Sequence, residues 1–279
     1  MVNNLKTAVL LAGLGGLCVF VGSLWGPSGA VLGLLVGLAM CGGSYWFSDR
    51  LAIRSARAVE VTAAQMPQYH AIVADLAGRA GLPTPRLYVS PEAQPNAFAT
   101  GRNPANAAVC VTEGLLHHMD WEQIQGVLAH EISHVWHRDI LISSVAAAVA
   151  MGITFVASIA RWAMIFGGGR SDDRDNPLAG LLMLMLAPLA AALIQAAISR
   201  SREFEADAAA ARLLGTGEPL AAALERLEVG AQTVPSRVNP AEASAYIVNP
   251  LRGQHFANLF STHPPTEERI ARLRSGSWA

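Results

Sequence analysis

Long stretches without a charged side chain are the strongest constraint that this sequence places on its fold. After Lys6 no charged residue occurs before Asp49, and 52% of all residues are hydrophobic. A helix needs about 20 consecutive apolar residues to cross a hydrocarbon core of about 30 Å, so this stretch has room for two such helices. The apolar content also exceeds that of a typical soluble domain. We therefore expect an integral membrane protein.

The first two apolar runs have the composition of a transmembrane hairpin. They cover residues 7–25 and 30–47, and a Gly-Pro turn separates them. Three arginines follow the second run within ten residues, whereas the turn is uncharged. The positive-inside rule then places both ends of the hairpin in the cytoplasm. We expect residues 1–48 to form this hairpin.

A second pair of apolar runs predicts another hairpin over residues 140–199. The runs cover residues 140–160 and 176–199, and a polar loop containing Gly168 joins them. Arg161 lies at the end of the first run, where its side chain can reach the interface. Because both runs are rich in alanine, helices buried in protein are an alternative to membrane spans.

The remaining chain, residues 49–139 and 200–279, has the composition of one soluble domain in two parts. Helical periodicity, turn residues and short β-rich runs predict its elements. Asp120 with Gln123 forms a capping-box pattern that opens the helix expected to carry the main motif. We expect helices over 63–79, 121–137 and 218–229, one ending at Leu214 and one after Pro265, and strands over 86–89, 96–100 and 107–112.

The sequence His130-Glu131-Ile132-Ser133-His134 is the most specific motif in the chain. On a helix, residues four apart project from one face, so the two imidazoles can share a metal ion. Glu131 then lies beside the metal, where its carboxylate can take the proton of a water that attacks a carbonyl. The alternative is that the motif occurs by chance. A chance motif could lie anywhere in the chain, but this one falls on a helix with a good N-terminal cap.

A third ligand must come from elsewhere in the chain, since a catalytic zinc site has three protein ligands and an open position. The segment that follows residue 199 offers Glu203, with Glu205 as a rival. Asp207 lies one helical turn after Glu203, so it can orient a histidine ligand through the free ring nitrogen. The alternative is a charged helix start exposed to solvent.

The motifs occur in an order that resembles the HtpX-type bacterial membrane metalloproteases, relatives of the CAAX prenyl proteases. The resemblance covers nearly the whole chain and rests on the His-Glu-x-x-His helix, the Glu203 to Asp207 segment, Pro95 to Gly101, and Ser261 to Pro265 followed by Arg269. It implies a mainly α fold, in which integral membrane helices join an α+β gluzincin-like metalloprotease domain with a small β-sheet.

The resemblance also implies roles for individual residues. The ligands of one zinc ion per chain would be His130, His134 and Glu203, which favours Glu203 over Glu205. Glu131 would be the catalytic base and Asp207 the carboxylate behind a ligand. Further residues are implied near the cleft: His263 and Arg269 as donors to the oxyanion, and Asn96, Ala97, Phe98 and Ala99 as the edge strand that binds substrate backbone. For His263 and Arg269, ordinary helix capping is an alternative explanation.

The implied activity is that of a zinc metalloendopeptidase of the bacterial cytoplasmic (inner) membrane, multi-pass, with its active site facing the cytoplasm. Its partners would be the lipid bilayer and misfolded or membrane polypeptides, in quality control under stress. There are three alternatives: an intramembrane zinc protease, a CAAX-type enzyme, and a catalytically silent scaffold that binds unfolded segments. The net charge of -1 gives no basis for binding nucleic acid, and the sequence carries no signal for an oligomeric state.

Overall fold

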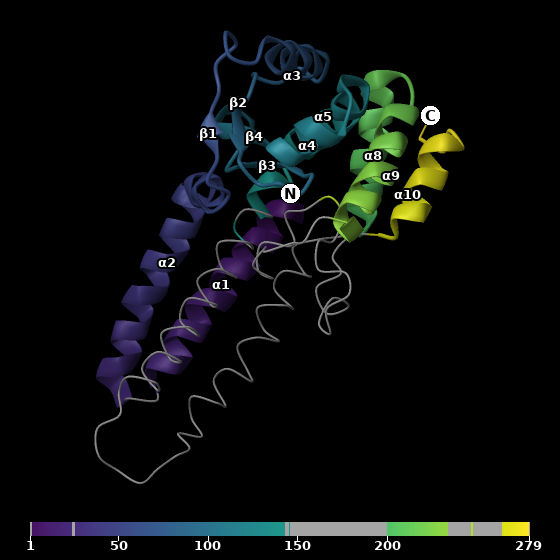
Figure 1. Ribbon diagram of the computed structural model, residues 1–279. Helices are drawn as coiled ribbons and strands as arrows, with labels where there is room; N and C mark the ends of the chain where they lie inside the picture. Colours follow the sequence, from purple (N-terminus) through teal and green to yellow (C-terminus); the bar gives the residue numbers. More distant parts are fainter. Residues whose placement is uncertain are drawn as a thin grey trace.

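The computed structural model describes residues 2–23, 26–142, 145, 200–233, 247 and 264–278. Two long helices lie side by side and extend from a body in which helices surround a small sheet (Figure 1). The mainly α class with a small sheet is thus confirmed. The helices are α1 (Val2–Ser23), α2 (Gly26–Ser55), α3 (Pro67–Arg79), α4 (Glu113–His118), α5 (Trp121–Trp136), α8 (Arg200–Leu214), α9 (Glu218–Thr233) and α10 (Thr266–Arg274).

The sheet has four strands in the order β1-β2-β4-β3. Strand β2 pairs in parallel with β4, and the other two pairs are antiparallel. Every residue of the inner strand β4 is buried, because both of its faces are covered. This order leaves β3 at an edge of the sheet. The strands are β1 (Val59–Glu60), β2 (Arg86–Ser90), β3 (Ala97–Gly101) and β4 (Ala107–Thr112), and the 3-10 turn η1 (Pro104–Asn106) precedes β4.

Helix α5 lies at the centre of the main hydrophobic core and contacts α3, α8, α9 and β3. Its predicted capping box is present, since the side chains of Asp120 and Gln123 each accept a hydrogen bond from the other residue's backbone. Helix α9 approaches α5 at Gly126, where a Cβ atom would overlap the backbone of Leu220. The core therefore fixes α5 from several sides.

Some predicted elements differ from those observed. Helix α3 begins at Pro67 rather than at residue 63, because proline is favoured at the first helical position and disfavours helical backbone in the residue before it. Helix α9 continues to Thr233, beyond the predicted end at residue 229. The short elements β1 and α4 have too few residues for a periodic signal and were not predicted.

Helix α2 continues past its apolar segment and packs on the sheet. Ile53 of α2 contacts a cluster that includes Tyr88, Ala108 and Cys110. An ion pair of 3.0 Å between Asp49 and Arg86 joins the same two elements. The face of the sheet that is not covered by α5 thus rests on the end of α2.

In the described part of the chain, one helical segment is long and apolar enough to cross a membrane, residues 26–47 of α2. Its large apolar side chains are exposed, Leu32 and Leu38 by more than 60% of their area. A shorter apolar segment lies in α1 at residues 11–20. The predicted second hairpin falls outside the described residues apart from 140–142 and 145, so a four-span topology stays a prediction.

Glycines allow α1 and α2 to approach closely. A Cβ atom on Gly33 of α2 would overlap the carbonyl oxygen of Cys18 in α1, and one on Gly22 of α1 would overlap that of Gly29. Small residues at helix contacts are typical of membrane helices, where the packing of the backbones supplies much of the attraction. Val145, which follows α5, packs with Leu14 against this pair of helices.

We expect Gly33→Ala to destabilise the protein in detergent, because the added methyl group must push α1 away from α2. Overpacking of this kind costs about 1–3 kcal/mol, which should lower the midpoint of thermal unfolding. Gly42→Ala is the matched control on the same helix, since nothing lies within 4 Å of a Cβ there. Equal midpoints for the two variants would contradict the close packing of the hairpin.

Candidate metal centre

Helix α5 places the imidazoles of His130 and His134 against each other. Their Nε2 atoms are 3.2 Å apart, and the ring planes are nearly perpendicular at 87°. His130 is buried and His134 is partly buried. Both rings project from the same side of the helix, as the spacing of four residues predicts.

Helix α8 brings the carboxylate of Glu203 to the same point. Its oxygens lie 3.7 Å from Nε2 of His130 and 3.7 Å from Nε2 of His134. The candidate ligand atoms of the three residues all lie within 4.8 Å of one another. Glu205, the rival in the sequence, is exposed to solvent. The geometry favours Glu203.

Each imidazole has a carboxylate at its other nitrogen. Asp207 Oδ1 lies 2.9 Å from Nδ1 of His130, and Asp139 Oδ2 lies 3.1 Å from Nδ1 of His134. A neutral histidine that donates from Nδ1 carries its lone pair on Nε2. Both lone pairs are then directed into the space beside Glu203. Asp139 was not predicted. The signal that could have indicated it is an acidic residue that follows soon after the end of α5.

Arg269 reaches this cluster through Asp207. Its side chain is only 1% exposed, and its Nε and Nη2 donate to the two Asp207 oxygens at 2.8 and 2.7 Å. Burial by itself would raise the pKa of Asp207, but Arg269 and His130 hold it well below its usual range. The guanidinium also donates to the carbonyl of Ile247. This geometry favours a positioning role for Arg269 over the oxyanion contact that the resemblance implies.

Glu131 is buried and is held by the edge strand. Its Oε2 accepts a hydrogen bond of 2.7 Å from the backbone N–H of Ala99 in β3. Burial raises the pKa of Glu131, although the two imidazoles and this N–H act in the opposite direction. The carboxylate therefore lies between the paired imidazoles and the sheet edge.

The predicted substrate strand divides into residues with different environments. Asn96 is tied down, because its backbone pairs with Thr112 and its side chain accepts from the Ile247 N–H. Phe98 packs toward α2, and Ala97 is fully buried. In an antiparallel pair, alternate residues turn their backbone groups away from the partner strand. Ala99 is such a residue, since its N–H goes to Glu131. His263 lies outside the described residues.

The donor set fits a zinc ion. Two imidazole nitrogens with one carboxylate form a known catalytic zinc set, and tetrahedral zinc holds ligand nitrogens roughly 3.3 Å apart. The observed separation of 3.2 Å between His130 Nε2 and His134 Nε2 matches this value. Two nitrogen lone pairs at that distance repel each other unless a cation or a proton lies between them.

Without a metal ion, the negative groups around His134 keep its ring protonated. Burial by itself would lower the pKa of His134, but the hydrogen bond to Asp139 and the charges of Glu203 and Glu131 outweigh it and raise the pKa to about 9. Zinc binds only the neutral ring. Binding at neutral pH must therefore release this proton.

Comparisons with known proteins give matches over most of the chain. The profile of peptidase family M48 matches residues 63–277. A protease HtpX homolog of Ralstonia pickettii (strain 12J) is 50% identical over 278 residues, which cover 98% of this chain and 96% of that protein. The homolog of Pelotomaculum thermopropionicum is 47% identical over 277 residues, covering 98% of this chain and 99% of the relative.

Among solved structures, the fold is similar to that of Ste24p from S. mikatae, with a TM-score of 0.52 and 21% sequence identity. The match covers 98% of this chain but 65% of the Ste24p chain. A similar overall fold thus occurs in a larger protein of low sequence identity.

We expect the zinc affinity of the metal-free protein to rise with pH by about tenfold per unit from pH 7 to 9, because one proton leaves His134 for each zinc ion bound. A fluorescent zinc chelator in competition with the protein measures this slope. Asp139→Asn should flatten the slope, since it removes the charge that favours the imidazolium. Asp75→Asn, at an exposed position of α3, should leave the slope unchanged. If the zinc affinity of the unmodified protein did not change with pH, His134 would not be the protonated ligand that zinc binding must neutralise.

Proposed function

The chain belongs to peptidase family M48 and is a metallopeptidase, and from this premise we propose a specific activity. It is a membrane-bound zinc endopeptidase that cleaves misfolded or membrane polypeptides at the cytoplasmic face, in protein quality control. The observation that carries the proposal is the convergence of His130, His134 and Glu203 beside the buried carboxylate of Glu131.

The residues present would hold zinc and perform the proton transfers. His130, His134 and Glu203 would be the ligands, and a zinc ion held by them would polarise the scissile carbonyl and acidify a water molecule. Glu131 accepts the proton of the attacking water and returns it to the leaving amine. A raised pKa suits this carboxylate to both transfers.

Residues behind the ligands would keep this geometry constant. Asp207 and Asp139 hold the two imidazole rings through their Nδ1 atoms. Arg269 holds Asp207 by two parallel hydrogen bonds, which define the position of the carboxylate in its plane. We assign these three residues to orientation of the ligands rather than to contact with substrate.

The edge strand supports binding of an extended polypeptide. Strand β3 has β4 on one side, and Ala99 turns its backbone groups to the other side, where Glu131 lies. A substrate that pairs with this edge is recognised through its backbone. Such recognition requires no particular side chain, which suits an enzyme that clears misfolded chains of many sequences.

The surroundings of α5 favour a site outside the bilayer over an intramembrane one. The helix is covered by α3, α8, α9 and the sheet, and its first turn carries the exposed Glu122. The arginines that follow the apolar segment of α2 support a cytoplasmic position for the whole body. A CAAX-type activity would need more spans around a large chamber than this sequence provides.

We expect Glu131→Gln to retain one zinc ion per chain but to lose cleavage of casein by at least 100-fold, because an amide cannot accept the proton. Metal content and the release of new amino termini measure the two properties. Glu122→Gln, an exposed position on the same helix, is the matched control and should cleave normally. Undiminished cleavage by the Glu131 variant would refute the proposed base.

The same assay distinguishes the proposed enzyme from a catalytically silent scaffold. A scaffold would bind unfolded casein and yet release no new amino termini, whether or not Glu131 is intact. The enzyme should release them only when zinc is present, and a chelator should stop the release.

The membrane topology has its own test. We expect an alkaline phosphatase fused at residue 168 to be active, since the predicted second hairpin places that loop outside the cytoplasm. The matched control is a fusion after residue 279, which should be inactive as phosphatase but fluorescent as green fluorescent protein. A cytoplasmic signal at residue 168 would contradict the second hairpin.

A further inference from the structure

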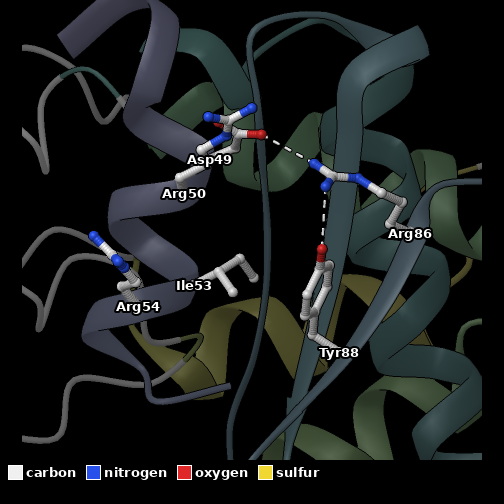
Figure 2. A pocket seen from close by; sticks show the side chains of 6 residues that line it. All are labelled: Asp49, Arg50, Ile53, Arg54, Arg86 and Tyr88. Carbon is white, nitrogen blue, oxygen red and sulfur yellow. Dashed lines mark hydrogen bonds and ion pairs between the residues drawn. The ribbon is translucent and has the colours of Figure 1, made fainter. Parts of the chain in front are cut away.

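A cavity lies between the end of α2 and strand β2, on the side of the sheet opposite α5. It has a volume of about 360 Å³ and is lined by Asp49, Arg50, Ile53, Arg54, Arg86 and Tyr88. Figure 2 shows Ile53 reaching from α2 toward Tyr88, with Arg50 and Arg54 on the same helix and Arg86 across from them. The catalytic residues described above do not line it.

The charges around the cavity are unbalanced. Three arginines and only one carboxylate, that of Asp49, line the cavity. Asp49 is already paired with Arg86 at 3.0 Å, and Arg86 also donates to the hydroxyl of Tyr88. Arg50 lies over the ring of Phe47, and neither Arg50 nor Arg54 has an ion pair within the described part of the chain. Two positive charges are thus available to an anion.

The position of these arginines matches the headgroup layer of a membrane. The apolar segment of α2 ends at Phe47. With a rise of 1.5 Å per residue, Arg50 lies about 4.5 Å and Arg54 about 10 Å beyond that end. The polar layer of one leaflet is roughly 5–8 Å thick. Arg50 therefore lies within the headgroup layer, and Arg54 lies just outside it on the aqueous side.

We propose that this cavity binds the headgroup of one anionic phospholipid. The inference rests on the membrane placement of α2 in the proposed function. The guanidinium of Arg50 donates to the phosphate, and that of Arg54, which points away from β2 in Figure 2, turns toward it on binding. Basic pockets beside membrane helices are known sites for anionic headgroups.

The apolar members of the cavity favour a lipid over a free phosphate ion. Ile53 and the ring of Tyr88 form part of its wall, and the exposed ring of Phe47 lies beside Arg50 on the bilayer side. These groups can contact the glycerol and the first methylenes of a lipid but offer nothing to inorganic phosphate. The Asp49 and Arg86 pair fixes the cavity wall and joins α2 to the sheet.

The test is native mass spectrometry of the full-length, delipidated protein with dioleoyl phosphatidylglycerol, and with dioleoyl phosphatidylcholine as the neutral lipid. We expect one phosphatidylglycerol to bind before any others and phosphatidylcholine to bind at least tenfold more weakly. R50Q/R54Q should weaken the first site roughly 30-fold, given the contribution of each arginine near an anionic surface. R50K/R54K, which keeps the charge, should lose less affinity for phosphatidylglycerol than R50Q/R54Q does.

Controls separate this site from general charge effects and from the proposed function. R79Q/R226Q removes two exposed arginines of α3 and α9 and should bind phosphatidylglycerol as the unmodified protein does. R50Q/R54Q should still cleave casein in detergent. Membrane placement is measured separately, by extraction of membranes with carbonate.

Several results would overturn the lipid site. They are equal binding of the two lipids, a gradual filling without a distinct first site, or unchanged binding by R50Q/R54Q. Displacement of the lipid by millimolar inorganic phosphate would assign the cavity to a soluble anion instead. If the unmodified protein did not cleave casein at all, the peptidase proposal would be refuted, but the result on lipid binding would still stand.

Discussion

The carboxylate of Asp207 is the contact on which the arrangement of the candidate site depends. It lies on α8, accepts two hydrogen bonds from Arg269 of α10, and lies 2.9 Å from the ring of His130 on α5. All three side chains are buried. Because a buried charge that loses its partner costs roughly 3–5 kcal/mol, the three helices are held in one relative position. The candidate metal ligands on α5 and α8 are thereby fixed in the same arrangement.

The sequence predicts those parts of the molecule whose signals are local. His130 and His134 needed only the spacing of four residues on a helix, and the Asp120 capping box correctly marked where that helix begins. The strand over residues 107–112 was found with its observed limits because a run of β-forming residues lies between turns. Each of these signals arises from contacts within a few residues of the chain.

Contacts between distant elements were harder to predict. The hydrogen bond from the Ala99 N–H to Glu131 involves a backbone group, so no residue type signals it. Asp139 is recognised as the partner of His134 only when the end of α5 is seen to fold back on the ring. Arg269 was expected near the cleft, but its bidentate contact with Asp207 depends on how α8 and α10 pack. The Glu203 ligand came from a resemblance as much as from spacing, since Glu205 fits the same local pattern.

The edge strand β3 connects helix α2 to the carboxylate of Glu131, the proposed catalytic base. Its last residue, Gly101, is followed by Arg102, whose guanidinium lies 4.9 Å from the ring of Trp46 on α2. Two residues before Gly101, the N–H of Ala99 holds Glu131. A polypeptide that leaves the bilayer beside α2 and pairs with β3 would therefore reach Glu131 within a few residues. For the proposed peptidase of membrane proteins, this short path would be an advantage of packing α2 directly on the sheet that is proposed to bind substrate.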